Sequence, residues 1–300
     1  MYSEHVAIAG AGAIGCYFGG MLARAGVPVT LIGRANHVDA INRDGLFLER
    51  ADFQEYVNLK ASTAIEAVRD ATIVLLSVKT IDTETAALSV APNLHGGTLL
   101  VSFQNGVDNV ERIHKAAGIH AIPAVVYVAA AMAGPGRVKH NGRGDIVIGD
   151  APRVAALFEA ARIPCRISDN IAGELWTKLV MNCAYNAISA VTRSRYAFIK
   201  DNPLTRDVMK QLIEEVVAVG RAAGVVMPTV EDLTMAAMKL GDSMANATSS
   251  TEQDLARGRL TEIDSLNGYV ARRGSELGVA VPVNATLYAL VKMLESSPRP

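Results

Sequence analysis

The chain has 300 residues, half of them hydrophobic, and carries 29 Lys and Arg against 30 Asp and Glu, for a formal net charge of −1. This length exceeds that of most single domains, so two domains are expected, each with its own core. The charges form no run that would follow a phosphate backbone or an anionic membrane, which argues against nucleic acid and membrane partners.

The N-terminal region leads directly into a strand pattern, without the basic and apolar segments that direct secretion. No stretch of about 18 apolar residues is present that would cross a membrane. The three cysteines, Cys16, Cys165 and Cys183, lie among apolar neighbours at unrelated spacings. We expect reduced, packed thiols rather than a disulfide, a metal site or a nucleophile. These features predict a soluble, cytoplasmic protein without a metal.

A glycine-rich turn follows the first predicted strand, residues 5–9. Residues 10–15 have the sequence Gly-Ala-Gly-Ala-Ile-Gly, and a helical pattern and a second strand at residues 28–32 come next. Such a turn between a strand and a helix is typical of a dinucleotide site, because the helix offers free N–H groups and its positive dipole end to phosphates. The alternative is a tight turn without a ligand.

Each glycine of this turn has a predicted purpose. Gly10 permits the tight turn, Gly12 lets the backbone approach a pyrophosphate, and Gly15 lets the helix pack closely on the sheet. We expect the cofactor to contact the whole turn, including Ala13 and Ile14.

Arg34 follows the second strand, where a chain that binds NAD usually has an acidic residue for the ribose hydroxyl. An arginine at this place suits the 2′-phosphate of NADPH/NADP+. A charge-assisted hydrogen bond contributes about 1.5–3 kcal/mol, which corresponds to roughly a ten- to hundredfold preference for NADPH. The alternative is a solvated surface arginine.

Further strand patterns occupy residues 45–49, 55–59, 72–78, 98–102 and 121–131. Lys79 stands just beyond strand 72–78, and Asn105 stands just beyond strand 98–102. Ligands of open parallel sheets collect at the carboxyl ends of the strands. We therefore expect Lys79 and Asn105 to lie at the same edge as the glycine turn and to contact the cofactor.

The remaining patterns of the first half predict a helix at 80–90, a hairpin around Asn141-Gly142, a helix at 152–162 and a strand at 164–168. From residue 170 the periodicity is helical, with helices expected at 203–223, 230–241, 243–257, 261–277 and 285–295, and a frayed tail at 296–300. The predicted fold class is α/β, with an N-terminal Rossmann-type dinucleotide-binding domain at residues 1–169 and an all-α C-terminal domain at residues 170–300.

A helix that begins near Asn170 carries Lys178, Asn182 and Asn186, four residues apart. Each residue turns about 100°, so successive members of this polar stripe drift only about 40° around the axis. The other positions are largely apolar on every side, as in a helix buried within a protein. The alternative to a functional stripe is a lysine that reaches solvent and asparagines that bond to nearby loops.

Two other polar segments stand out in the second half. Thr248, Ser249 and Ser250 interrupt a helical pattern, and helix capping is the alternative to a binding role. Residues 261–264, Thr-Glu-Ile-Asp, predict a capping box in which Asp264 replaces the usual Glu. Glu262 has no structural purpose in this interpretation.

These motifs together resemble those of the ketopantoate reductases (2-dehydropantoate 2-reductases), over nearly the whole chain. The lysine helix combined with the downstream Thr-Glu-Ile-Asp segment is more specific than the glycine turn alone. The resemblance rests on Gly10 to Gly15, Lys79, Asn105-Gly106, Glu174-Leu-Trp-x-Lys-Leu-x-x-Asn182, Ser249-Ser250, Gly258-Arg-x-Thr-Glu-Ile-Asp264 and Leu266-Asn-Gly268.

The resemblance implies NADPH-dependent reduction of 2-dehydropantoate, a small 2-oxo acid, to pantoate on the route to pantothenate and coenzyme A. It implies that Lys178 is the catalytic proton donor and Glu262 the carboxylate beside it. The groups implied to hold the substrate or the nicotinamide are Ser250, Asn182, Asn186 and Asn105.

Two departures from the family pattern leave alternatives open. Tyr196 lies where the resemblance implies a further substrate-contacting asparagine, and the hydroxyl segment is one residue longer than usual. The alternatives are a reductase of a different 2-oxo acid and a non-catalytic NADP-binding sensor protein. The apolar helices of the second domain could pack internally or across a homodimer, so the oligomeric state is also open.

Overall fold

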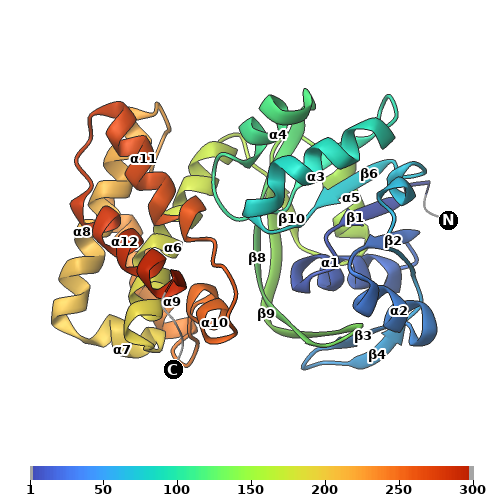
Figure 1. Ribbon diagram of the computed structural model, residues 1–300, viewed down its shortest axis with the longest axis horizontal. Coiled ribbons are helices and arrows are strands. Elements are labelled where there is room, and N and C mark those ends of the chain that lie inside the picture. Colours follow the sequence, from blue (N-terminus) through green and yellow to red (C-terminus); the bar gives the residue numbers. More distant parts are fainter. Residues whose placement is uncertain (1–2, 297–300) are drawn as a thin grey trace. The chain divides into compact units, whose positions relative to one another are not determined.

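A computed structural model describes residues 3–296, and most of the predicted C-terminal tail lies outside them. The chain divides between Ile171 and Ala172 into two compact units. The first unit contains a ten-stranded sheet flanked by helices, and the described part of the second contains helices and no strand (Figure 1). This arrangement confirms the predicted fold class.

Short apolar strands form the parallel part of the sheet. Every residue of β1, β2 and β6 is buried, as expected for strands covered on both faces by helices. The strand order is β7-β6-β1-β2-β5, and all neighbours in it are parallel. The strands are β1 (Val6–Ala9), β2 (Val29–Ile32), β5 (Lys60–Ser62), β6 (Ile73–Leu76) and β7 (Leu99–Ser102).

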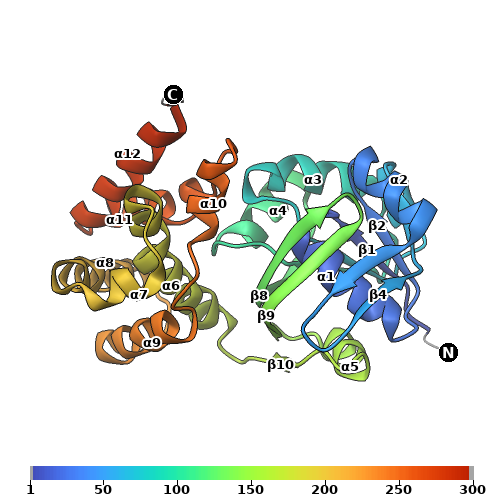
Figure 2. The same cartoon turned by 90° about the horizontal axis from the view of Figure 1, so that it is seen from below.

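A long antiparallel hairpin, visible from below in Figure 2, extends the sheet beyond β7. Its first strand begins parallel to β7 and continues antiparallel to the next strand of the hairpin. The strands of this part are β3 (Leu46–Glu49), β4 (Gln54–Val57), β8 (Ala121–Gly134), β9 (Arg137–Ile148) and β10 (Cys165–Ile167). The predicted strand regions are thus confirmed.

The prediction of a hairpin turn at Asn141-Gly142 is wrong. The chain reverses between Gly134 and Arg137, with Gly136 at φ +62°, and Asn141-Gly142 lies inside β9. The register with β8 is irregular there, since Ala129 pairs with Gly142 and Ala130 with His140. A β-bulge uses the same backbone freedom as a tight turn, so the Asn-Gly pair does not distinguish them.

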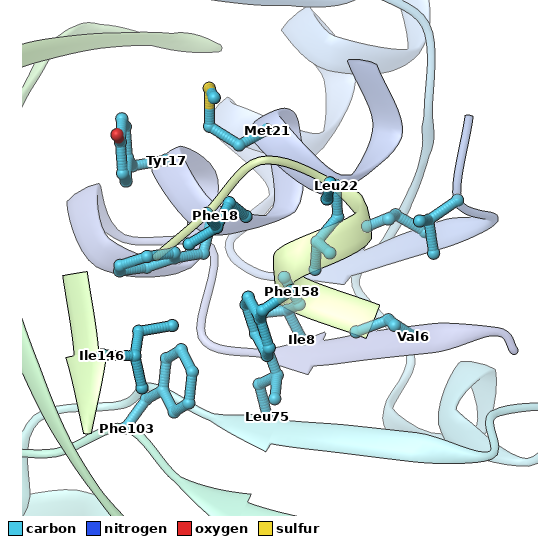
Figure 3. Packing of buried hydrophobic residues seen from close by; sticks show 14 of the residues in the cluster. Val6, Ile8, Tyr17, Phe18, Met21, Leu22, Leu75, Phe103, Ile146 and Phe158 are labelled. Carbon is cyan, nitrogen blue, oxygen red and sulfur yellow. The ribbon is translucent and has the colours of Figure 1, made fainter. Parts of the chain in front are cut away.

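Helices cover both faces of the sheet, and alternate residues of β1 face two different cores. Val6 and Ile8 belong to a core that α1 and α5 cover, whereas Ala7 and Ala9 belong to one that α3 and α4 cover. Figure 3 shows the first core, in which Phe18 lies among other aromatic rings. The helices are α1 (Ala13–Arg24), α2 (Ala35–Asp44), α3 (Thr83–Val90), α4 (Asn109–Ala117) and α5 (Pro152–Ala160). Short 3₁₀ turns occupy Ile65–Val68, Thr80–Asp82 and Ala91–Asn93.

The second unit is a set of packed helices in which α8, α11 and α12 contact one another (Figure 1). The helices predicted at 203–223, 230–241 and 285–295 are confirmed. The elements are α6 (Ile171–Thr192), α7 (Tyr196–Asp201), α8 (Pro203–Ala222), α9 (Val230–Ser243), α10 (Ser250–Ala256), the 3₁₀ turn η4 (Ile263–Ser265), α11 (Asn267–Leu277) and α12 (Pro282–Ser296).

Two helix predictions in this unit are wrong. Residues 243–257 do not form one helix, because the chain leaves α9 at Ser243 and restarts at Ser250. The helix expected at 261–277 begins only at Asn267. Ser249 caps α10, since its Oγ accepts a hydrogen bond from the Glu252 amide at 3.0 Å, and this confirms the capping interpretation of the hydroxyl segment.

The three cysteines are buried free thiols, as expected. Burial, together with the charge of Glu159, raises the pKa of the Cys165 thiol to about 11. None of the helices in the described part of the chain combines the length and apolarity needed to cross a bilayer.

Replacing Phe18 by Ala tests the first core. Phe18 is fully buried, with its ring centroid 5.5 Å from that of Phe103, so we expect the free energy of unfolding to fall by about 3–5 kcal/mol. Urea unfolding followed by circular dichroism measures it. The control is Leu88→Ala on α3, where the side chain is 55% exposed and a change below about 0.5 kcal/mol is expected. Similar effects of both substitutions would contradict the assignment of this core.

Candidate active site

Close packing of backbone on backbone shapes the glycine turn after β1. Gly10 has φ +121°, and a Cβ added there would lie 2.7 Å from the Ser77 carbonyl carbon at the end of β6. A Cβ on Gly15 would overlap the Gly10 carbonyl oxygen and lie 2.7 Å from Ser77 Oγ. Ser77 Oγ also donates a hydrogen bond to the Gly10 carbonyl at 2.8 Å. The predicted structural purposes of Gly10 and Gly15 are therefore met in the fold.

Gly12 differs from these two glycines, because a Cβ added to it would find nothing within 4 Å. It stands at the N-cap position of α1, whose first helical hydrogen bond runs from the Cys16 amide to the Gly12 carbonyl at 2.8 Å. The amides of Ala13, Ile14 and Gly15 precede that bond and have no acceptor within the helix. This end of α1 thus combines open space with free N–H groups, the features that a pyrophosphate requires.

Arg34 is exposed at the N-cap position of α2, directly after β2. Its carbonyl accepts hydrogen bonds from the amides of His37 and Val38, which starts the helix. Burial, and secondarily the charge of Arg34, lower the pKa of His37. The preceding residue, Gly33, has close contact with the glycine turn, since a Cβ on it would lie 2.5 Å from the Ala11 Cβ. Arg34 is thereby held beside the turn.

Lys79 and Asn105 follow neighbouring parallel strands, β6 and β7, and both are half-buried. The carboxyl ends of β2, β1, β6 and β7 lie in succession along one edge of the sheet. The first unit therefore brings the glycine turn, Arg34, Lys79 and Asn105 to that edge, which is where ligands of open parallel sheets bind.

A buried polar network, which the sequence analysis did not identify, joins the loops that carry Lys79 and Asn105. Gln104 Nε2 donates to the Val78 carbonyl at 3.2 Å and to Thr83 Oγ1 at 2.7 Å. Asn109 Nδ2 donates to the Asn105 carbonyl at 2.6 Å. The signal for this network is a glutamine just after a buried strand. Its partners lie in the loop after β6 and at the start of α3, so local spacing does not predict them.

In the second unit, α6 carries the polar stripe of Lys178, Asn182 and Asn186. Lys178 and Asn182 are half-buried, and Asn186 is only 4% exposed. Trp176 of the same helix packs edge-on against Tyr269 of α11, with ring centroids 5.9 Å apart. Twelve of its 22 residues are buried, which confirms a helix within the protein rather than on its surface.

Tyr196 contacts the C-terminal end of the stripe. Its ring stacks on that of Tyr185 with centroids 4.3 Å apart, and its hydroxyl donates to Asn186 Oδ1 at 3.4 Å. Burial raises the pKa of both phenols, that of Tyr185 to about 12, so both hydroxyls are protonated donors at neutral pH. Tyr196 thus interacts with the stripe through Asn186.

Ser249 connects α10 to the same part of α6. Its Oγ donates to the Asn186 carbonyl at 3.1 Å, and its amide donates to Ser189 Oγ at 3.1 Å. Ser250, the predicted substrate contact, is the exposed first residue of α10. The hydrogen bonds between Ser249 and α6 therefore fix the position of Ser250, the next residue along the chain.

The predicted capping box at residues 261–264 is wrong. Thr261 Oγ1 accepts from the Ile263 amide at 3.1 Å, whereas Asp264 is bound by Tyr288 and Lys292 of α12. Glu262 stands at the N-cap position of η4 and is half-buried. Among the described residues, no group of three or more His, Cys, Asp or Glu side chains could hold a metal ion.

A Rossmann-type edge with a glycine turn, in a chain whose helical unit carries a lysine stripe, is typical of one class of proteins, the oxidoreductases that use a nicotinamide dinucleotide. The family model described as ketopantoate reductase PanE/ApbA matches residues 6–153, and its C-terminal counterpart matches residues 170–295. A 2-dehydropantoate 2-reductase of Pyrococcus horikoshii is 33% identical over 96% of this chain and 97% of its own length. The chain belongs to the ketopantoate reductase family and is an oxidoreductase.

Solved structures agree with this assignment. A PanE/ApbA family ketopantoate reductase from Ralstonia eutropha is 48% identical, with a TM-score of 0.93 over 97% of this chain and 98% of that one. A D-mandelate dehydrogenase in complex with NADH and anilino(oxo)acetate is 25% identical, with a TM-score of 0.91 over 97% and 98% of the two chains. The ligand of that structural neighbour, NADH, is a nicotinamide dinucleotide.

Two alanine substitutions in the glycine turn separate packing from cofactor binding. Gly15→Ala creates an overlap and is expected to lower the free energy of unfolding by about 1–3 kcal/mol. Gly12→Ala is expected to change it by less than about 1 kcal/mol, yet to weaken NADPH binding at least about tenfold by filling the space for the pyrophosphate. Urea unfolding and fluorescence titration measure the two quantities. Unchanged NADPH affinity in the Gly12 variant would argue against a pyrophosphate at this turn.

Proposed function

We propose that this protein reduces 2-dehydropantoate to pantoate with NADPH, on the route to pantothenate and coenzyme A. The observation that carries the proposal is the lysine of α6, half-buried and in line with two asparagines, in a chain whose other unit has a glycine turn at the carboxyl edge of a parallel sheet. Relatives named 2-dehydropantoate 2-reductase, matched over nearly the full chain, support the choice of substrate. A cytoplasmic location agrees with three buried free thiols.

The residues of the first unit fit a bound NADPH. The open space at Gly12 and the free amides of Ala13 and Ile14 would hold the pyrophosphate. Arg34 would bind the 2′-phosphate. Lys79 and Asn105 would contact the cofactor farther along the same edge, and Asn105 would also hold the nicotinamide or the substrate.

The chemistry of this proposal assigns a task to each polar residue of the second unit. Bound NADPH would supply the hydride to the carbonyl carbon of the 2-oxo acid. The Lys178 ammonium stabilises the negative charge that grows on the carbonyl oxygen and donates its proton from Nζ to that oxygen. Glu262 favours the charged form of this lysine. Asn182, Asn186 and Ser250 orient the substrate.

A second candidate is a reductase of a different 2-oxo acid. It is favoured by Tyr196, which stands where the family pattern implies a substrate-contacting asparagine, and by the similarity to a D-mandelate dehydrogenase that binds anilino(oxo)acetate. Comparing kcat/KM across 2-oxo acids with branched alkyl and aryl side chains distinguishes the two. Binding of NADPH without its oxidation by any tested 2-oxo acid would favour a sensor protein, and light scattering would test a homodimer.

Replacing Lys178 by Ala removes the proposed proton donor. We expect kcat to fall by about two to four orders of magnitude, the range for lost general acid catalysis. NADPH oxidation in the presence of 2-dehydropantoate measures it. Lys239→Ala, at an exposed site on α9, should leave kcat unchanged. A nearly unchanged kcat in the Lys178 variant would remove this residue from the mechanism.

Arg34→Ala tests the choice of cofactor. NADPH binding is expected to weaken about ten- to hundredfold, since one charge-assisted hydrogen bond is lost, whereas NADH binding should not change. Calorimetric titration at fixed salt measures both affinities. The matched control is Arg43→Ala on the same helix, an arginine whose side chain is 69% exposed and paired with Asp44. Equal weakening of both cofactors would refute a 2′-phosphate contact.

A further inference from the structure

The segment that carries Glu262 is attached to the C-terminal helix α12 on both sides of this residue. Thr261 precedes Glu262 and binds Glu295, and Asp264 follows it by two positions and binds Tyr288 and Lys292. These contacts join residues 24 to 34 positions apart. Tyr288, Lys292 and Glu295 are spaced four and three residues apart, so they share one face of α12.

The first attachment is a buried carboxylate. Glu295 Oε1 accepts hydrogen bonds from the Thr261 amide at 2.8 Å and from Thr261 Oγ1 at 2.6 Å. The Glu295 side chain is only 4% exposed. Thr261 Oγ1 in turn accepts from the Ile263 amide at 3.1 Å. The backbone on either side of Glu262 is therefore bound through one threonine.

The second attachment is at Asp264. Tyr288 Oη donates to its Oδ1 at 2.6 Å, and Lys292 Nζ donates to its Oδ2 at 2.9 Å. Arg272 donates to the Asp264 carbonyl at 2.9 Å. Gly268 permits the approach of the tyrosine, since a Cβ there would lie 2.7 Å from Tyr288 Cε2.

Lys292 connects the two attachments, because its Nζ also lies 2.7 Å from Glu295 Oε2. The adjacent carboxylates of Glu295 and Asp264 raise the pKa of Lys292 despite its partial burial. Burial opposes the charge of Asp264, but the bonds from Tyr288 and Lys292 outweigh it and lower its pKa. An ammonium shared between two carboxylates thus holds both ends of the segment.

Glu295 is the costly member of this network, because its side chain is 4% exposed, whereas those of Lys292 and Asp264 are 38% and 46% exposed. Charged groups taken out of water lose hydration, and apolar side chains of similar volume often stabilise as well or better. What the charged groups add is a defined geometry for the residues they bind. A catalytic carboxylate requires such definition, since small displacements of reacting groups lower rates strongly.

We propose that Tyr288, Lys292 and Glu295 are positioning residues that hold Glu262 for the reaction with Lys178. This inference rests on the proposed function and deepens it, because it assigns α12 to the same site.

The test compares Tyr288→Phe, Lys292→Met and Glu295→Gln with the wild type and with a control, Glu276→Gln. The control removes a surface ion pair with Arg273 on α11. Each of the three variants should lower kcat about tenfold with the KM for NADPH unchanged. Lys292→Arg should retain most of kcat, because the charge and both carboxylate contacts are kept. Tyr288→Phe removes a single hydroxyl. It provides the test of positioning if Lys292→Met lowers the melting temperature. Unchanged kcat in all three variants would overturn the proposal.

A double-mutant cycle with Glu262→Gln distinguishes positioning from general stability. If α12 acts through Glu262, Lys292→Met should change kcat less than about twofold in the Glu262→Gln background. Multiplicative effects would show that α12 acts elsewhere and would overturn the inference.

Hydrogen exchange gives a second measurement that needs no turnover. The amides of Thr261 and Ile263 should exchange about tenfold faster in the Glu295 and Lys292 variants than in the wild type or the control. If the wild type oxidised NADPH with none of the 2-oxo acids, the proposed function would fail, and this exchange would still decide whether α12 holds the segment. Unchanged exchange rates would overturn the claim that α12 holds the segment that carries Glu262.

Discussion

Close backbone packing at the glycine turn is the constraint on which the first unit depends. Gly10 and Gly15 leave no room for a Cβ against Ser77, and Gly33 leaves none against Ala11. The ends of β1, β2 and β6 therefore meet at van der Waals distance, and the start of α1 is fixed over all three. Of the three glycines in the turn, Gly12 alone has no atom within 4 Å of an added Cβ. Packing therefore leaves space beside the turn at Gly12, the position where we propose that a pyrophosphate binds.

In the second unit, the positions of the loops are fixed by hydrogen bonds from buried polar side chains. In the first unit, they are fixed by glycines, which have no side chain. Ser249 binds the Asn186 carbonyl, and Glu295 binds Thr261. Each contact ties a segment between helices to a helix distant in sequence, and in each case the neighbouring residue carries a proposed function. A loop held by such hydrogen bonds has little conformational freedom. The position of the neighbouring side chain is therefore fixed more precisely than apolar packing alone would fix it.

Local patterns predicted the parts of the site that depend on local geometry. Arg34 could be placed because parallel strands end at one edge, and Lys178 because helical periodicity aligns residues four apart. Asn141-Gly142 gave a wrong prediction, since bulges and turns share one backbone preference. The partners of Asp264 lie 24 and 28 residues away, and those of the Gln104 amide lie in the loop after β6 and at the start of α3. No pattern of a few residues contains such information, because it arises only when helices and strands pack.

Burial changes along α6 in a way that bears on how its stripe works. Lys178 and Asn182 are half-buried, whereas Asn186 is almost fully enclosed, with Tyr196 on its side chain and Ser249 on its carbonyl. Lys178, the proposed proton donor, would need to reach the substrate from a helix that is itself held in place. The enclosed end of α6 supplies that rigidity, because Asn186 is held from two segments beyond the helix. Tyr196 therefore belongs to the support of the stripe, and a change of its size would act on Lys178 through the helix rather than by direct contact.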